Sequence, residues 1–334
     1  MVTQPVAVLG AGAWGTALAC VLADAGRPVW LWGRDEAQRR QLRSFRENRR
    51  YLPDILLPAS IQVLEDLGAL PADCRWVVLA TPCQTTRDMA GRLRKAAPHV
   101  AGVVCAAKGL EAGSRKLVHE VAAEALGPSV TVALLSGPTF AREVAEGRPA
   151  AVTIASSDEA FGRALVARFH SPSFRPYLTT DRVGVAVGGS VKNVLAIAAG
   201  VADGMQLGAN SRAALITRGL AEVARFGSAL GARRETFMGL SGLGDLVLTC
   251  TDDQSRNRRL GLALGAGETR AQAEARIGLV EGASTAAAVA AEAGRLGVEM
   301  PIVAEVAALL EGARGPREVV ARLMAREPGT EGAG

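Results

Sequence analysis

The stretch Val6-Ala7-Val8-Leu9-Gly10-Ala11-Gly12-Ala13-Trp14-Gly15 decides the fold of the first half of this chain. Its four leading residues are apolar and have the length of a strand that is buried on both faces. The GxGxxG that follows opens residues 14–25, in which Ala and Leu recur at helical spacing. A strand, a glycine turn and a helix in this order begin a dinucleotide-binding βαβ unit. A glycine-rich turn with a structural role alone is the alternative.

Each glycine of the motif has its own reason to lack a side chain. Gly10 permits the tight turn, Gly12 lets the backbone approach a pyrophosphate, and Gly15 allows the helix to pack closely on the strand. The free N–H groups and the positive dipole end of the helix then face the phosphates. The sequence therefore predicts a dinucleotide site at this turn.

The end of the second expected strand bears on the choice of cofactor. An NAD site usually has an acid there for the ribose hydroxyls, whereas this chain has Trp32-Gly33-Arg34-Asp35. Arg34 offers a guanidinium that suits a 2′-phosphate, and Asp35 could still serve NAD. An Arg34 that is simply exposed is the alternative. We expect NADP(H) to be accepted alongside NAD(H).

Further along, apolar strands and amphipathic helices alternate up to about Thr180. This alternation predicts a parallel, doubly wound α/β sheet in a Rossmann-like domain over residues 1–182. The expected strands cover residues 6–9, 29–32, 76–80, 103–106, 130–135 and 151–155, and the expected helices 14–25, 36–45, 85–97 and 116–126.

The alternation stops after Thr180, and only helical patterns follow. We therefore expect an all-α substrate and catalytic domain over residues 183–330, followed by a flexible tail over 331–334. The expected helices cover residues 181–208, 211–230, 255–264, 270–277, 284–296, 301–310 and 317–326.

Composition narrows the classes of function. A net charge of +5 mildly favours anionic ligands, but only 4% of the residues are aromatic, which fits nucleic-acid binding poorly. Five cysteines without a CxxC pair and three scattered histidines predict no metal site and a reduced, cytoplasmic protein. Residues 5–23 carry no charge, yet three glycines interrupt them and no basic segment precedes them. We expect neither a targeting signal nor an integral membrane segment.

Lysine is rare in this chain, and its positions are informative. Only four of the 38 basic residues are lysines. Lys108 ends the apolar run 103–107, and Lys192 is the sole charged residue in 183–202. A lysine in apolar surroundings is a candidate proton donor or base, which an arginine is not. A lysine whose stem packs while its ammonium reaches water is the alternative for both.

Three later segments are unlike ordinary core sequence. A turn of small polar residues covers 135–141, two glycines precede Lys192-Asn193, and residues 239–245 end at Asp245. Thr249 then leads to Ser255-Arg256-Asn257 at the start of an expected helix, where side-chain donors and free N–H groups suit a phosphate. A helix cap is the alternative for Asp245, and a surface ion pair for Arg256.

These segments belong to long strings that occur in one order along nearly the whole chain. The chain resembles bacterial NAD(P)-dependent glycerol-3-phosphate dehydrogenase in these strings. They are GAGAWGTALA, Tyr51-Leu52-Pro53 with Leu57-Pro58, Lys108-Gly109-Leu110-Glu111, LSGPTFAREVAEGRPAA, HSPSFRPY, GGSVKNVLAIAAGVADG, NSRAALITRGLAE, GLSGLGDLVLTCT, SRNRRLG and the VEG that contains Glu281.

The resemblance implies a cytosolic homodimer that reduces dihydroxyacetone phosphate to sn-glycerol 3-phosphate for phospholipid synthesis. It implies that Lys192 is the catalytic acid and base, that Lys108 helps to polarise the carbonyl, and that Asp245 orients the lysines. The implied cofactor contacts are Gly10, Gly12, Trp14, Gly15, Arg34, Lys108, Ala141, Arg256, Leu279 and Glu281. The implied substrate contacts are Lys108, Gly137, Thr139, Lys192, Asn193, Asp245, Thr249, Ser255, Arg256 and Asn257.

The chain departs from the resembled pattern at two places, and two other functions remain open. Position 186 is Ala where relatives commonly have Glu or Gln, and residues 81–83 are Thr-Pro-Cys where Val-Pro-Ser is usual. One rival function is a lysine-dependent dehydrogenase that acts on a hydroxy acid or ketopantoate. The other is an NADP(H)-sensing protein without catalysis, although such a protein would not need Lys108, Lys192 and Asp245.

Overall fold

The computed structural model describes residues 4–327, so the tail expected over 331–334 lies outside the described residues. The chain forms two compact units. The first contains the residues up to Lys108 together with Val118–Arg182, and the second contains Gly109–Leu117 and the residues from Val183 onward. The short segment Gly109–Leu117 was expected to belong to the first unit, because the predicted first domain covered residues 1–182. Within the second unit, its Arg115 forms an ion pair with Glu292 (3.3 Å).

The first unit is built on an eight-stranded sheet in the order β10-β9-β8-β7-β6-β1-β2-β5. The central strands are short and fully apolar because helices cover both faces of the sheet. The strand bounds are β1 Val6–Leu9, β2 Val29–Trp32, β5 Ile61–Val63, β6 Trp76–Leu79, β7 Gly102–Cys105, β8 Thr131–Ser136, β9 Ala150–Ala155 and β10 Phe174–Thr179.

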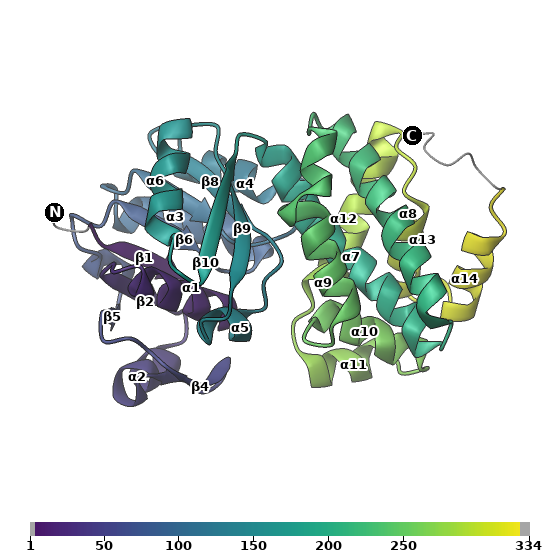
Figure 1. Ribbon diagram of the computed structural model, residues 1–334, viewed down its shortest axis with the longest axis horizontal. Helices are drawn as coiled ribbons and strands as arrows, with labels where there is room; N and C mark the ends of the chain where they lie inside the picture. Colours follow the sequence, from purple (N-terminus) through teal and green to yellow (C-terminus); the bar gives the residue numbers. More distant parts are fainter. Residues whose placement is uncertain (1–3, 328–334) are drawn as a thin grey trace. The chain divides into compact units, whose positions relative to one another are not determined.

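Helices form a layer on each face of this sheet (Figure 1). One layer holds α1 Ala13–Asp24, α5 Ala141–Ala145 and α6 Glu159–Phe169, and the other holds α3 Thr86–Ala96 and α4 Val118–Leu126. Helix α2, Glu36–Phe45, follows β2 and leads to the small hairpin β3 Glu47–Asn48 and β4 Leu52–Leu56. The doubly wound α/β fold is therefore confirmed.

The sheet is parallel, as predicted, except at one pair of strands. β8 and β9 are antiparallel, with Leu135 opposite Ile154. The chain between them contains only the five-residue helix α5, whereas the crossover between parallel strands is usually formed by a longer helix. β10 then pairs parallel with β9. Strands β5 and β10 and the hairpin were not predicted.

The second unit is mostly helical, and its described part also contains an isolated β-bridge between Leu110 and Leu117. Its longest helices are α7 Arg182–Gly204 and α8 Gly208–Ala229, and a π-helical turn, η4 Leu240–Gly244, leads into α9 Asp245–Thr251. The remaining helices are α10 Arg256–Gly265, α11 Arg270–Ile277, α12 Glu281–Leu296, α13 Pro301–Leu310 and α14 Pro316–Met324, with the 3-10 turn η3 Arg234–Met238 before η4.

Glycines let two other segments approach α7 closely on either side of Lys192. A Cβ at Gly188 would collide with the backbone oxygen of Ser241 in η4. A Cβ at Gly200 would collide with the backbone of α10, and one at Gly261 would collide with α7 in return. The small residues of α7 therefore place η4, α9 and α10 against the part of α7 that carries Lys192.

Helix α7 is also long and apolar enough to cross a membrane by length and composition. However, 94% of its most apolar window is buried inside the protein. Core helices of soluble proteins share this composition, so α7 is only weak evidence for a membrane span.

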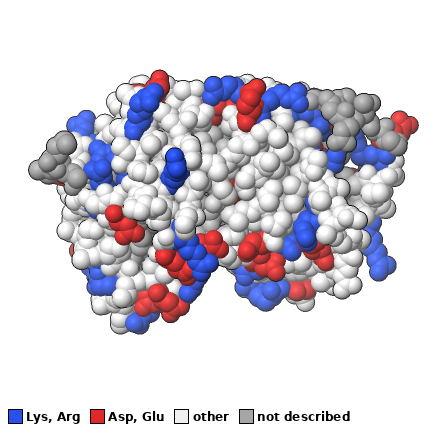
Figure 2. Space-filling model, in the orientation of Figure 1, with Lys and Arg blue, Asp and Glu red and all other residues white. Residues whose placement is uncertain are grey.

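Charged side chains of both signs are interspersed on the surface drawn in Figure 2. Several arginines of the chain belong to local ion pairs, such as Arg40 with Glu36 and Arg142 with Glu146. On this face, the net positive charge of the chain is therefore not gathered into one basic stripe of the kind that binds nucleic acid.

Candidate functional site

The glycine turn after β1 has the geometry of a phosphate cradle. Gly10 has a φ of +121°, and a Cβ there would meet the backbone of Ala80 at 2.6 Å. A Cβ at Gly15 would collide with the carbonyl oxygen of Gly10. By contrast, a Cβ at Gly12 would meet nothing within 4 Å, and no side chain caps α1 there. The space above Gly12 and the uncapped N-terminus of a twelve-residue helix fit a pyrophosphate.

The residues after β2 have separate tasks. Asp35 is the N-cap of α2, and its Oδ1 accepts hydrogen bonds from the backbone N–H of Ala37 (2.9 Å) and of Gln38 (3.4 Å). The Arg34 side chain is exposed, and its carbonyl oxygen accepts a hydrogen bond from Arg39 (3.0 Å). The carboxylate of Asp35 thus caps helix α2, while the guanidinium of Arg34 lies at the surface.

Three predicted substrate residues of the first unit lie together. Lys108 is half-buried, and its Nζ donates to the carbonyl oxygen of Gly137 (3.4 Å), which also accepts from the Thr139 hydroxyl (3.3 Å). Gly137 has a φ of +152°, and a Cβ there would meet Val152 Cα at 2.9 Å. Only glycine therefore allows the turn after β8 to present this carbonyl to the lysine.

Lys192 lies at the centre of the candidate site in the second unit. Its Nζ donates to Asp245 Oδ1 (2.5 Å) and to Thr249 Oγ1 (2.6 Å), and the Thr249 hydroxyl in turn donates to the Asp245 carbonyl oxygen (2.6 Å). The side chains of Lys192 and Asp245 are 8% and 0% exposed. Asp245 is the first residue of α9, but its carboxylate receives the lysine, in contrast to the helix-cap alternative. A buried charge pair of this kind persists only with close partners.

A second cluster adjoins Lys192 along α7. Asn257 Nδ2 donates to Asn193 Oδ1 (3.0 Å), and Asn257 Oδ1 accepts from the backbone N–H of Gly282 (2.8 Å). The other end of the Asn193 amide, Nδ2, is buried and has no partner among the described residues. Gly282 was not predicted, yet a Cβ there would meet the Asn193 carbonyl oxygen at 2.7 Å. A buried donor without a partner indicates a place for a ligand oxygen.

The start of α10 carries the residues that were predicted to bind phosphate. Ser255 is the N-cap, and its Oγ accepts from the backbone N–H of Arg258 (3.2 Å). Arg256 is exposed and forms no ion pair with the residues that the structure describes, in contrast to the surface-pair alternative. The helix N-terminus and Arg256 together present positive charge at this point.

The other predicted cofactor residues occupy varied surroundings. Trp14 and Ala141 are half-buried against the core of the first unit. In the second unit, Leu279 is 58% exposed, an unusual position for a large apolar side chain, and Glu281 is the first residue of α12. The departures from the resembled pattern, Ala186 and Cys83, are both buried.

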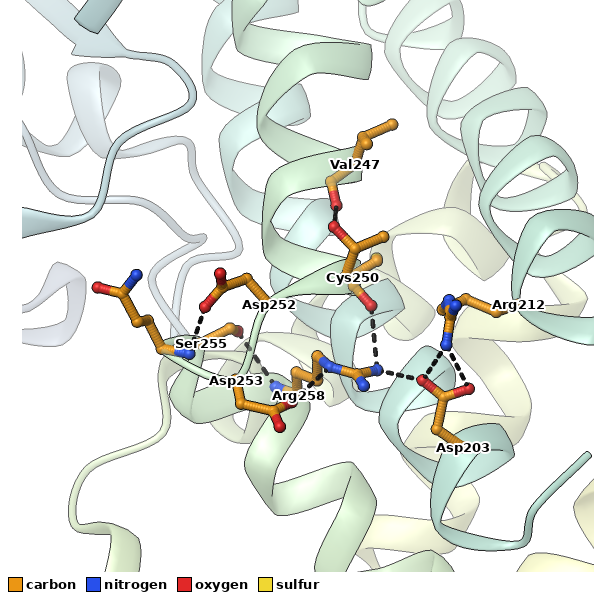
Figure 3. Close-up of polar contacts among 10 residues, drawn as sticks. Asp203, Arg212, Val247, Cys250, Asp252, Asp253, Ser255 and Arg258 are labelled. Carbon is orange, nitrogen blue, oxygen red and sulfur yellow. Dashed lines mark hydrogen bonds and ion pairs between the residues drawn. The ribbon is translucent and has the colours of Figure 1, made fainter. Parts of the chain in front are cut away.

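One network of ion pairs beside the site was missed from the sequence. Arg258 forms ion pairs with Asp203 and Asp253 and donates to the Cys250 carbonyl oxygen (3.1 Å), while Arg212 also pairs with Asp203 (Figure 3). Within the string Ser255-Arg256-Asn257-Arg258-Arg259 the arginines look alike, so no local signal separates Arg258 from its neighbours.

A cavity of the second unit lies away from the predicted site residues. A cavity of about 1080 Å³ opens among α7, α8, α13 and α14, and its wall includes Leu215, Glu222 and Ile302 but none of the predicted site residues. Among residues 4–327, no three His, Cys, Asp or Glu side chains gather in a way that could hold a metal ion.

Comparison with known proteins gives one family. The description "NAD-dependent glycerol-3-phosphate dehydrogenase N-terminus" matches residues 5–162, and the C-terminus of the same family matches 181–321. Glycerol-3-phosphate dehydrogenase [NAD(P)+] of Xanthomonas euvesicatoria pv. vesicatoria is 50% identical over 97% of this chain and 96% of that protein. The Stenotrophomonas maltophilia (strain R551-3) enzyme is 49% identical over 96% and 95%. The crystal structure of the Coxiella burnetii enzyme is 42% identical and superimposes with a TM-score of 0.94 over 98% of this chain and 100% of that one.

Proposed function

Because the chain belongs to the NAD-dependent glycerol-3-phosphate dehydrogenase family, it reduces dihydroxyacetone phosphate to glycerol 3-phosphate with NAD(P)H, and we propose that Lys192 supplies the proton. The observation that carries this proposal is the buried Lys192 Nζ held between Asp245 Oδ1 and Thr249 Oγ1. Two fixed partners aim the amine, and the apolar surroundings exclude water that would otherwise exchange its proton.

The proposed chemistry is a proton transfer that accompanies carbonyl reduction. When bound, the reduced nicotinamide supplies the hydride. As the substrate carbonyl oxygen gains negative charge, Lys192 Nζ gives it a proton, and in the reverse direction the neutral amine removes that proton. Before the transfer, the carboxylate of Asp245 balances the positive charge of the Lys192 ammonium, and the hydroxyl of Thr249 orients that ammonium. We assign Lys108 to polarisation of the same carbonyl, with Gly137 and Thr139 as its neighbours.

We assign the substrate phosphate to the N-terminus of α10. Ser255, Arg256 and Asn257 provide a hydroxyl, a guanidinium and an amide there, and the helix end adds its positive dipole. The buried Asn193 Nδ2 is a donor for a further substrate oxygen. A carboxylate substrate such as ketopantoate needs fewer donors than this group offers.

The function is tested by following NADPH absorbance in parallel reactions of the purified protein. Dihydroxyacetone phosphate should cause rapid loss of NADPH, whereas ketopantoate and a blank without substrate should not. Inorganic phosphate should compete with dihydroxyacetone phosphate. Equal or faster loss with ketopantoate would favour the hydroxyacid rival, and cofactor binding without turnover of either substrate would favour the sensing role.

Arg34 is expected to favour NADPH over NADH. Arg34→Ala should raise KM for NADPH by about tenfold or more, because a charge-assisted contact to the 2′-phosphate is lost, and should leave KM for NADH within about twofold. Steady-state kinetics with both cofactors measure this split. Arg40→Ala on the exposed face of α2 is the matched control, since Arg40 already pairs with Glu36. An equal rise for both cofactors would contradict the assignment.

We propose, from the family alone, that the remaining cofactor contacts are Trp14, Lys108, Ala141, Arg256, Leu279 and Glu281. We also propose a cytoplasmic homodimer whose product supplies glycerophospholipid synthesis. Sedimentation of the purified protein at micromolar concentration tests the dimer.

A further inference from the structure

Arg258 joins three separate segments of the second unit through one guanidinium. Its Nε donates to Asp253 Oδ1 (2.8 Å) in the loop between α9 and α10. Its Nη1 donates to the Cys250 carbonyl oxygen (3.1 Å) in the last turn of α9 and also to the Asp203 carboxylate near the end of α7. The side chain is only 9% exposed and that of Asp203 is 11% exposed, so the contact between them is largely shielded from solvent.

The backbone of the same residue fixes the other end of the loop. The Arg258 N–H donates to the Ser255 Oγ that caps α10, and the Gln254 N–H donates to Asp252 Oδ1 (2.8 Å). Figure 3 shows the loop from Asp252 to Ser255 lying beside the Arg258 guanidinium. The conformation of this loop decides where the first turn of α10 begins, and hence where Ser255, Arg256 and Asn257 stand.

Charge keeps the Asp203 end of the network in place. Burial by itself would raise the pKa of Asp203, but hydrogen bonds from Arg258 and Arg212 outweigh that effect and hold the pKa below its ordinary value. Asp203 is therefore ionised at neutral pH, and its two arginine partners lie on α10 and α8. The guanidinium of Arg258 is thus anchored from the α7 side as well as from the loop.

We propose that Arg258 is a positioning residue for the phosphate end of the substrate, because it holds the α9–α10 loop and so sets the placement of Ser255, Arg256 and Asn257. The inference rests on the proposed phosphate site at α10. Arg258 itself is turned toward Asp203 and Cys250 and acts through the loop. Its loss should weaken binding of the phosphate group more than it slows the chemical step.

The test replaces Arg258 by methionine and by lysine in the full chain. Arg258→Met should raise KM for dihydroxyacetone phosphate and the inhibition constant of inorganic phosphate together, each by about tenfold or more. kcat should fall less than KM rises. KM for NADPH should rise less than KM for dihydroxyacetone phosphate, because of Ser255, Arg256 and Asn257 only Arg256 is also assigned to the cofactor. Arg258→Lys should bind dihydroxyacetone phosphate and inorganic phosphate more tightly than Arg258→Met but less tightly than wild type. Lysine keeps the positive charge near Asp203 but cannot donate to several acceptors at once as the guanidinium does.

Glu305→Gln is the matched control. Glu305 lies on α13 and, like Asp203, accepts hydrogen bonds from two arginines, Arg314 (3.2 Å) and Arg322 (2.9 Å). Among the described residues, it forms no hydrogen bond or ion pair with a residue of the candidate site. The Glu305→Gln variant should have a lower Tm and an unchanged KM for dihydroxyacetone phosphate. A purely structural Arg258 would give the same pattern, with a lower Tm and an unchanged KM, and that result overturns the inference.

A second variant decides the matter if Arg258→Met does not fold. Asp253 is 69% exposed, so Asp253→Asn leaves the core intact while it weakens the contact of Arg258 to the loop. It should raise KM for dihydroxyacetone phosphate severalfold, and an unchanged KM overturns the inference. Wild-type protein is measured beside the variants in every assay. If the wild type fails to reduce dihydroxyacetone phosphate, the proposed function is overturned rather than the role of Arg258.

Discussion

Lys192→Ala should lower kcat for reduction of dihydroxyacetone phosphate by about a thousandfold, since removal of a positioned general acid typically costs 10²–10⁴ in rate. The amine that the reaction needs is the one held at 2.5 Å from Asp245 and 2.6 Å from Thr249. NADPH binding should persist, because the phosphate cradle at Gly10 and Gly12 belongs to the first unit. Steady-state rates and fluorescence titration with NADPH measure the two effects separately.

Lys95→Ala is the control for this prediction. Lys95 is exposed on α3 in the first unit, so its loss removes an equal charge without touching the candidate site. It should turn over like wild type. A Lys192→Ala protein within about tenfold of wild-type kcat would show that the proton comes from another group.

Asp245→Asn should lower kcat by about a hundredfold at neutral pH and should also lower Tm. Loss of one partner from a buried ion pair leaves an uncompensated charge and typically costs about 3–5 kcal/mol of stability. Without this carboxylate, burial would favour the neutral amine of Lys192, which is far too weak an acid to protonate the substrate oxygen. Turnover of the variant should therefore rise as the pH is lowered, and a profile of kcat against pH measures this.

Thr249→Val separates the charge of Asp245 from simple alignment. It removes one acceptor of Lys192 but keeps the carboxylate, so it should cost only about tenfold in kcat and leave the pH profile unchanged. An Asp245→Asn enzyme with wild-type kcat, or with a profile as flat as that of Thr249→Val, would contradict the role given to Asp245.

Local periodicity was enough to predict several elements of both units. The strand at residues 6–9 and the helices at 36–45, 270–277 and 301–310 have the bounds that were expected. Each of these segments has a clear apolar period and a turn or cap residue at its ends, such as Asp35 before α2. Local sequence and tertiary packing agree in such segments, which makes them predictable.

Tertiary contacts decided what was missed. The direction of β9 depends on how the segment that connects it to β8 folds, and β10 is an edge strand with Pro176 in it. The segment Gly109–Leu117 has no periodicity that would assign it to either unit. Helix α9 follows a π-helical turn whose glycines suggest a loop.

The candidate site likewise contains residues that were predicted from the sequence and residues that were not. Lys192 was evident as a lone charge in an apolar run, and the resemblance supplied Asp245 and Thr249, which the structure brings into contact with it. Gly282 and Arg258 left no mark in the sequence, because their importance lies in a close approach to Asn193 and in an ion pair with Asp203, 55 residues away. Such contacts are visible only in three dimensions.

The most direct test of the central claim is the turnover of Lys192→Arg. Arginine keeps the positive charge beside Asp245 but does not release its proton near neutral pH. If Lys192 is the proton donor, this variant should bind NADPH, keep the fold and turn over dihydroxyacetone phosphate nearly as slowly as Lys192→Ala. A rate close to wild type would mean that position 192 supplies charge alone, and the proton donor would have to be sought elsewhere.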